Sequence, residues 1–316
     1  MLKNILITSS TGLVGHAFKN SNEFNRAIFI NGRKDVDLTD KDSVFKFFDR
    51  LDNQYKLPEI IINVAAKVGG IKANTEQMDD FFVQNIEIGK NILCAAQKYQ
   101  IPTVYSFLST CVYPEKVDGS FKENQIHNGP PPKSNLGYAY AKRATEIHSS
   151  ILKEKGFNYN CVIPNNLYGE NDLFDLNNCH VIPSMIRKIF EAKINNKPSV
   201  MFWGDGMALR EFTFASDIPK ILNFLIQKDN TESILNIGTS GEQRIIDVAN
   251  KIKEIIGYNG IICWEGTKTL AGQFRKPSDN SKLLSLGWKE SDFTSFDIGI
   301  RQTCDWFMKN YPNIRL

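Results

Sequence analysis

The feature that most constrains the fold of this chain is an alternation of short apolar, β-branched runs with longer segments that have a helical pattern. Such an alternation is typical of βαβ units, in which parallel strands form one sheet and the connecting helices cover its faces. The sequence therefore predicts an α/β fold with a Rossmann-type doubly wound parallel sheet. The predicted strands of its first half are residues 5–8, 27–30, 60–64, 104–108 and 160–163.

The alternation loosens after Pro164, which predicts a smaller C-terminal α/β domain. Residues 165–169 are expected to be a loop. The remaining predicted elements are helices at 181–192, 215–226, 245–256 and 293–308 and a strand at 234–237 that rejoins the sheet. The predicted division is a Rossmann domain over 1–165, joined by parts of about 212–240, and a substrate-binding domain over 166–211 and 241–316.

Composition excludes several classes of protein. Of 316 residues, 42% are hydrophobic and 23% are charged, which predicts a folded chain with a substantial core. The net charge is only +3 and its two signs are interspersed, so no nucleic-acid partner is expected. No apolar run is long enough to span a membrane, and residues 1–8 lack the core of a signal peptide, so we expect no membrane partner and a cytoplasmic location.

Cysteine and histidine spacing predicts no metal site. The six cysteines contain no CxxC pair, and the four histidines are widely dispersed. Disulfides are not expected either, because the cytosol keeps thiols reduced.

The segment 76–99 has the pattern of a helix that is buried on two sides. One apolar stripe comprises Phe81, Ile88, Ile92 and Ala95, and the other comprises Phe82, Ile86, Leu93 and Ala96. One stripe should face the sheet and the other a partner helix, which predicts a homodimer through paired helices. The alternative is a monomer with an extra covering helix.

A glycine-containing loop follows the first predicted strand and opens a helix, as in dinucleotide-binding proteins. In that motif Gly12 lets the backbone approach a pyrophosphate, and Gly15 allows close packing of helix and strand. Ser9 stands where the first glycine is usual. The predicted cofactor residues of this loop are Ser9, Thr11, Gly12, Leu13, Val14 and Gly15.

The end of the second strand predicts NADPH (NADP+) rather than NADH. Arg33 and Lys34 stand where an acidic residue would bind the ribose of NAD, and they can pair with a 2′-phosphate instead. The alternative is an ordinary basic pair on the surface. Further predicted cofactor contacts are Asp37 and Leu38 beside the adenine and Asn63, Ala65 and Ala66 beside the ribose chain.

A catalytic set follows the fourth strand. Tyr138 and Lys142 are four residues apart on one helical face, so the ammonium can lower the pKa of the phenol. Ser109 ends the preceding strand, and its hydroxyl can bind the same carbonyl oxygen. Tyr140 is a weaker candidate because Ala144 lies four residues after it. With a nicotinamide nearby, this set predicts reduction of a carbonyl, with Tyr138 as proton donor.

These residues and several longer strings resemble the GDP-L-fucose synthase family of extended short-chain dehydrogenases. The resemblance runs nearly from end to end. The strings that carry it are residues 65–70, 109–114, 126–131, 164–169, 180–183, 203–204, 210–212 and 272–274. It implies two reactions on a GDP-linked 4-keto-6-deoxy sugar, namely inversion at C3 and C5 and then reduction of the C4 ketone with NADPH.

The resemblance also implies individual roles. Cys111 matches the base of the epimerisation and His180 its acid, a reasonable pair because the C4 ketone acidifies the protons on both neighbouring carbons. The ordinary alternatives are a buried core thiol and a surface or core histidine. The further cofactor residues that we assign are Leu108, Pro164, Asn166, Leu167, Tyr138, Lys142 and His180, and the substrate residues are Asn165, Arg187, Trp203, Arg210 and Lys276.

Some of these assignments have plain alternatives. Arg187 and Lys276 could be ion-paired surface groups, and Asn165 and Asn166 could merely shape their loop. The sequence also departs from the family at Ser9 and at Ala271, where an acidic residue is frequent, which puts details of nucleotide contacts in question.

Three rival functions can be weighed on the same residues. A 4-keto reductase of another GDP-deoxysugar, such as a heptose, would not need Cys111 and His180. A non-catalytic NADPH-binding sensor would not need Ser109, Tyr138 and Lys142. A 4,6-dehydratase would carry an acidic pair where residues 110–112 read Thr-Cys-Val.

Overall fold

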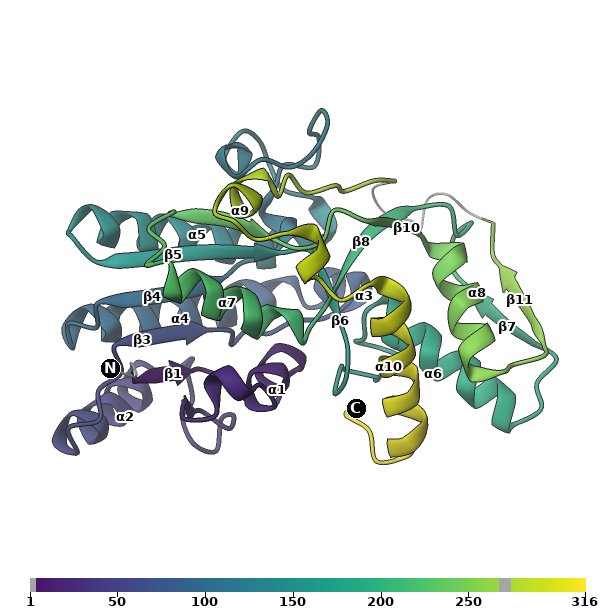
Figure 1. Ribbon diagram of the computed structural model, residues 1–316, viewed down its shortest axis with the longest axis horizontal. Helices are drawn as coiled ribbons and strands as arrows, with labels where there is room; N and C mark the ends of the chain where they lie inside the picture. Colours follow the sequence, from purple (N-terminus) through teal and green to yellow (C-terminus); the bar gives the residue numbers. More distant parts are fainter. Residues whose placement is uncertain (1–3, 267–273) are drawn as a thin grey trace.

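A six-stranded parallel sheet forms the centre of one half of the molecule in this computed structural model, which describes residues 4–266 and 274–316 (Figure 1). All its neighbouring strands are parallel, which confirms the predicted Rossmann-type sheet. In spatial order the strands are β2 (Ile28–Phe29), β1 (Ile5–Ile7), β3 (Ile60–Asn63), β4 (Thr103–Phe107), β5 (Asn158–Pro164) and β9 (Ile234–Ile237).

Helices cover both faces of this sheet. Ile61 packs into one core cluster while Ile60 and Ile62 pack into another, because successive side chains of a strand point to opposite faces. The first cluster includes residues of α2 (Lys41–Asn53), α4 (Met78–Lys98) and α5 (Leu136–Glu154), and the second includes residues of α1 (Leu13–Lys19) and α7 (Asp217–Gln227). Apolar side chains are therefore buried on both faces, as parallel sheets require.

The other half of the molecule has its own hydrophobic cluster, which lies to the right in Figure 1. Tyr168, Ile186, Ile252 and Phe307 are among its fully buried members. Its helices are α6 (Val181–Ile194), α8 (Ile245–Ile256) and α10 (Phe296–Asn310), and its strands are β6 (Asn166–Tyr168), β7 (Ser199–Phe202), β8 (Leu209–Phe214), β10 (Glu242–Arg244) and β11 (Ile261–Trp264).

The predicted loop at residues 165–169 is wrong. Asn166–Tyr168 forms β6, which pairs in parallel with β8 so that Asn166 lies opposite Phe212. The partner strand is more than forty residues away in sequence, so no local pattern announces this short strand. β7, β8, β10 and β11 were likewise not predicted, whereas the helices at α6, α7, α8 and α10 are confirmed within a few residues.

Helix α4 follows the expected pattern only in part. Every residue of the stripe that includes Phe81 and Ile92 is buried. The second stripe divides, because Leu93 and Ala96 are buried against the rest of the protein while Phe82 is exposed. Part of the second stripe therefore lacks cover within this chain.

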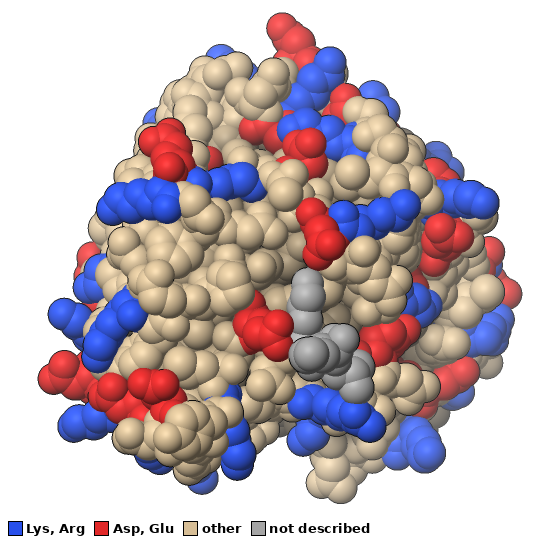
Figure 2. Space-filling view, turned by 60° about the vertical axis from the view of Figure 1, so that its left-hand side comes forward, with Lys and Arg blue, Asp and Glu red and all other residues tan. Residues whose placement is uncertain are grey.

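The described part of the chain contains no helix long and apolar enough to cross a membrane. Basic and acidic side chains are interspersed over the face shown in Figure 2, as the small net charge leads one to expect.

Close contact between the starts of α4 and α5 gives a test of this packing. A Cβ atom added at Gly137 would lie 2.3 Å from the backbone carbonyl oxygen of Met78. Gly137→Ala should lower the free energy of unfolding by about 1–3 kcal/mol in urea titrations, because this clash outweighs the propensity gain of alanine. The matched control is Gly129→Ala, where the nearest atom is 3.5 Å away. Equal stability of the two variants would contradict the packing described.

Candidate active site

Four groups of predicted site residues lie at one edge of the parallel sheet. β1, β3, β4 and β5 lie side by side in parallel, so their carboxyl ends meet at the same edge. Residues 8–12, 64–66, 108–111 and 165–166 follow these ends directly, and Asn63 and Pro164 are the last residues of β3 and β5. In open parallel sheets this is the edge at which ligands bind.

The glycine loop has the shape that its sequence predicts. Gly12 is the N-cap of α1, and apart from its chain neighbours no described residue comes within 4 Å of the place where its Cβ would be. A Cβ at Gly15 would lie 2.1 Å from the Ser9 carbonyl oxygen, so the helix can pack this close only with glycine there. Leu13 and Val14 begin the helix. The loop thus leaves open space at Gly12, and it keeps this shape with Ser9 in place of the usual first glycine.

Side chains that the sequence analysis missed hold this loop in place. Thr8 Oγ1 donates to Asn63 Oδ1 at 3.0 Å and accepts the Ala65 backbone N–H at 3.0 Å. Ser10 Oγ donates to Asn31 Oδ1 at 2.5 Å. Small polar residues at the ends of neighbouring strands are the signal that could have identified Thr8 and Asn31.

The basic pair after β2 is exposed at the rim of this edge. Arg33 Nη2 donates to Gln84 Oε1 at 2.8 Å, and its Nε lies 3.9 Å from Asp37 Oδ1. The Asp37 carboxylate accepts the hydroxyl and the backbone N–H of Thr39, and these hydrogen bonds lower its pKa. Leu38, in contrast, is a core residue.

Tyr138 and Lys142 lie together in the buried part of α5. Lys142 Nζ is 5.8 Å from the centroid of the Tyr138 ring and donates to the Phe107 carbonyl oxygen at 2.8 Å. Burial lowers the pKa of Lys142 to about 8. The pKa of Tyr138 is raised, chiefly by burial and further by the charge of Cys111. The expected lowering of the phenol's pKa is therefore wrong, because burial is the largest influence on the pKa and raises it.

Ser109 and Cys111 share a single 3₁₀ turn after β4, η2 (Thr110–Val112), against which α5 packs. Ser109 caps this turn by accepting the Cys111 backbone N–H at 3.4 Å. Cys111 is half-buried and packs, with Ala66, against a small cluster that contains Tyr138. The structure thus brings the candidate base of one reaction beside the candidate acid of the other.

Two cations complete the surroundings of Cys111. Burial lowers the pKa of Arg210 and of Lys276, and the charge of Cys111 opposes both shifts. Arg210 Nη1 also donates to the Phe274 carbonyl oxygen at 3.2 Å, which holds the strand and the 274–276 segment together. A groove of about 450 Å³ beside this segment is lined by residues 115–119, Phe121, Phe274 and Arg275.

The side-chain amides of Asn165 and Asn166 form hydrogen bonds with other residues of the chain. Asn165 accepts from Thr213 Oγ1 at 2.7 Å and donates to the Thr239 carbonyl oxygen at 2.9 Å. Asn166 Nδ2 donates to the Glu211 carbonyl oxygen at 2.8 Å. These contacts favour the alternative in which both residues shape the backbone. Of their neighbours, Pro164 pairs with Ile237 in the sheet and Leu167 packs against the core. Leu108, which directly follows β4, is buried in a core cluster.

The remaining candidates belong to the other half of the molecule. His180 caps α6; solvent reaches its side chain, yet the surrounding protein desolvates the imidazole enough to lower its pKa. Arg187 donates to Glu191 Oε1 at 2.7 Å and to the Phe174 carbonyl oxygen at 2.9 Å, which favours the ion-paired alternative. Trp203 is 59% exposed, with Lys188 Nζ 5.9 Å from its ring.

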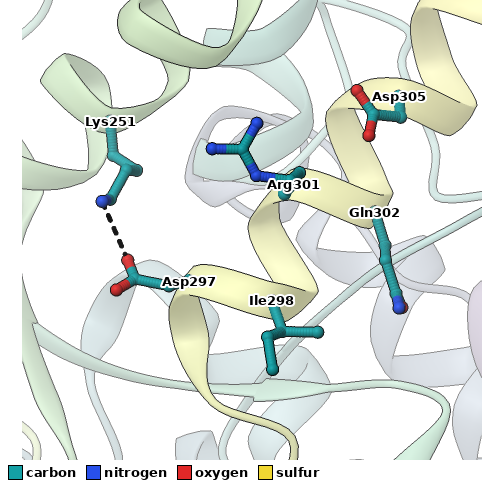
Figure 3. A pocket seen from close by; sticks show the side chains of 6 residues that line it. All are labelled: Lys251, Asp297, Ile298, Arg301, Gln302 and Asp305. Atoms are coloured by element: carbon teal, nitrogen blue, oxygen red, sulfur yellow. Dashed lines mark ion pairs between the residues drawn. The ribbon is translucent and has the colours of Figure 1, made fainter.

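A further groove, of about 400 Å³, lies between α8 and α10 (Figure 3). Lys251 points across it to Asp297, with 3.1 Å between Nζ and Oδ1. The groove is lined by Lys251, Asp297, Ile298, Arg301, Gln302 and Asp305. None of these is a candidate residue, so we do not assign this groove to the site. The departure at Ala271 lies outside the described residues.

The buried ammonium of Lys142 is expected to lower the free energy of unfolding of the wild type at neutral pH. At pH 7, Lys142→Met should unfold with a free energy equal to that of the wild type or up to about 3 kcal/mol higher, because a buried charge is removed. The folded-state pKa is about 8 and the ordinary value is 10.5, so wild-type stability rises between these pH values and the advantage of the variant shrinks. Urea titrations at pH 7 and pH 10 measure this, with Lys90→Met as the exposed control. A pH-independent loss of stability would contradict the desolvation described.

Known proteins show the same architecture. The model of the NAD dependent epimerase/dehydratase family matches residues 5–238. The GDP-L-fucose synthase of Dictyostelium discoideum is 33% identical over 320 residues, which cover 99% of this chain and 98% of that protein.

Solved structures of similar proteins share this fold. A GDP-L-fucose synthetase from Naegleria fowleri bound to NADP superimposes with a TM-score of 0.88 at 29% identity, covering 100% of this chain and 96% of that one. A GDP-6-OMe-4-keto-L-xylo-heptose reductase from C. jejuni reaches 0.87 at 26% identity, covering 98% and 99%. With its parallel sheet, glycine loop and Tyr-Lys helix, this chain belongs to the NAD dependent epimerase/dehydratase family.

Proposed function

We propose that this protein converts GDP-4-keto-6-deoxy-mannose to GDP-L-fucose by inverting C3 and C5 and then reducing the C4 ketone with NADPH. The observation that carries the proposal is the packing of Cys111 against the cluster of Tyr138. Arg210 and Lys276 are close enough for the charge of Cys111 to raise the pKa of each, against the lowering by burial. A site with a thiol base, a phenol acid and two cations suits a keto sugar on a diphosphate. The full-length similarity to GDP-L-fucose synthases supports this choice.

Epimerisation uses the thiol and the imidazole. The C4 ketone acidifies the protons at C3 and C5, so Cys111 can remove each proton as a thiolate. We assign to His180 the return of a proton to the opposite face of the ring, since it comes from α6 and Cys111 comes from the turn after β4. Arg210 and Lys276 bind the diphosphate and keep the sugar beside Cys111.

Reduction uses the residues of α5. Tyr138 is kept protonated by its burial, so it can donate its proton to the C4 oxygen, which Ser109 binds with its hydroxyl. Lys142 is held against β4 by the Phe107 carbonyl and stabilises the phenolate that remains. NADPH, when bound, supplies the hydride for C4.

The residues at the sheet edge fit NADPH. The open space at Gly12 admits a pyrophosphate to the start of α1. Arg33 and Lys34 are exposed after β2, the neighbour of β1 in the sheet, and they can pair with a 2′-phosphate. The assigned contacts of Asn63, Ala65 and Ala66 stay predictions, as do those of Arg187 and Trp203 to the substrate.

The first test is the reaction itself in deuterated water. The wild type should oxidise NADPH and yield GDP-L-fucose with deuterium at C3 and C5, identified by NMR. Cys111→Ser should slow incorporation of deuterium about 100-fold or more, the usual contribution of a general base. It should keep C4 chemistry, measured as oxidation of GDP-L-fucose by NADP+, within a few-fold.

Two outcomes would replace the proposal. NADPH oxidation without inversion or exchange would make the protein a plain C4 reductase, the alternative that its likeness to a heptose reductase favours. Binding of NADPH without turnover of any 4-keto sugar would make the protein a non-catalytic NADPH-binding sensor.

The cofactor assignment predicts a change in selectivity. Arg33→Ala and Lys34→Ala should each raise the KM for NADPH about 10-fold or more, because each removes a charge-assisted contact to the 2′-phosphate. Activity with NADH should stay unchanged. Steady-state kinetics with both cofactors measure this, and Arg301→Ala, on α10, is the matched control. Equal effects on both cofactors would place the 2′-phosphate elsewhere.

We also propose a homodimer through paired α4 and α5 helices. Tyr140, Ile147 and Ile151 on α5 and Phe82 and Val83 on α4 are large apolar residues with 40–48% of their surface exposed. The α5 residues recur at helical spacing, so they form one face. A face of this kind on two packed helices suits a second copy of the chain.

Ile147→Glu should therefore halve the mass of the protein measured by sedimentation, because it places a charge in the apolar contact. The control is Ile261→Glu on β11, at a residue that is 66% exposed and outside this face. A wild-type protein of monomeric mass would refute the dimer. The domain boundaries and the cytoplasmic location also stay predictions. The separate hydrophobic clusters support a division into two parts, although Leu283, Trp288 and Phe293, assigned to the second domain, pack in a cluster of the parallel sheet.

A further inference from the structure

Arg143 follows Lys142 on α5, and the mechanism above does not use it. Its side chain is only 5% exposed. Nε donates to the Val112 carbonyl oxygen at 2.8 Å, and the guanidinium carbon lies 5.5 Å from the centroid of the Tyr140 ring. Val112 is the last residue of the turn η2, whose middle residue is Cys111.

This contact fixes the far end of the turn. The near end is fixed by the sheet, because the Leu108 backbone N–H donates to the Val162 carbonyl oxygen at 2.8 Å. Within the turn, the Val112 N–H donates to the Ser109 carbonyl oxygen at 3.0 Å. Cys111 therefore sits between an anchor on β5 and an anchor on α5, and Ser109 is nearer to the first.

Stability alone does not explain a cation at this place. Burial lowers the pKa of Arg143, which reports the desolvation of its charge. Its Nη2 is buried and has no hydrogen-bond partner among the described residues. A buried charge with an unpaired donor is unfavourable, and an apolar side chain would avoid this penalty.

We propose that Arg143 is a positioning residue for the epimerisation, which acts by holding the turn so that the Cys111 thiol faces C3 and C5 of the sugar. α5 then serves both reactions: Tyr138 donates its proton to the C4 oxygen, Lys142 stabilises the phenolate that remains, and Arg143 orients the base. This inference rests on the proposed function and adds a residue to it.

The test separates the two half-reactions in the full-length protein. Arg143→Met removes the donor at similar length, Arg143→Lys keeps a cation that can reach the carbonyl, and Arg301→Met on α10 is the matched control. Three rates are measured: deuterium exchange at C3 and C5 of GDP-4-keto-6-deoxy-mannose without NADPH, oxidation of GDP-L-fucose by NADP+, and alkylation of each cysteine by iodoacetamide, followed by mass spectrometry.

We expect Arg143→Met to slow exchange at least 10-fold while GDP-L-fucose oxidation stays within 3-fold, and Arg143→Lys to recover part of the exchange. Alkylation of Cys111 should become several-fold faster while Cys94 and Cys263 stay unchanged, because the turn is loosened. Parallel losses in both reactions, or no loss in either, would overturn the inference.

Failure of the proposed function gives a different result. In that case the wild type itself shows neither exchange nor oxidation. The rate of Cys111 alkylation is then the only measurement that tests the role of Arg143. Faster alkylation confined to Cys111 supports the positioning by Arg143, and an unchanged rate refutes it. If Arg143→Met does not fold, the same comparison is made with Arg143→Lys.

Discussion

The hydrogen bond from Lys142 Nζ to the Phe107 carbonyl oxygen is the contact on which the rest of the site depends. It ties α5 to the last residue of β4, so the helix and the turn that follows this strand keep a fixed relation. Tyr138 comes from the helix, and Ser109 and Cys111 come from the turn. Together with the hydrogen bond from Arg143 to the Val112 carbonyl oxygen, it gives the groups of the two proposed reactions a common anchor on α5.

Burial shifts the pKa values of the two groups that α5 supplies for the reduction. Desolvation lowers the pKa of Lys142 and raises that of Tyr138, so each group is shifted toward its neutral form. A neutral phenol is the species that can donate a proton to a ketone oxygen. The same burial is unfavourable for folding, as expected where a site is built for chemistry rather than stability.

Sequence predicted those parts of the molecule that depend on local pattern. The parallel strands and the flanking helices follow from runs of apolar residues, and Tyr138, Lys142 and the glycine loop follow from spacing. β6 was missed because its three residues become a strand only beside β8. Asn165, assigned to substrate, is hydrogen-bonded to Thr213 and Thr239, and only the fold brings these residues together. For the same reason Arg143 could not be recognised from its own segment, whereas the positions of Thr8 and Asn31 at strand ends were a signal that we did not use.

The most direct test of the account is a crystal structure of the protein with NADP+ and GDP-L-fucose. The account predicts that the C4 oxygen of the sugar lies within about 3.2 Å of the Tyr138 hydroxyl and within hydrogen-bond distance of Ser109. The Cys111 sulfur should face C3 and C5, and the diphosphate should contact Arg210 and Lys276. A sugar bound with C4 away from Tyr138, or with Cys111 facing away from the ring, would contradict the claim that one site performs both reactions.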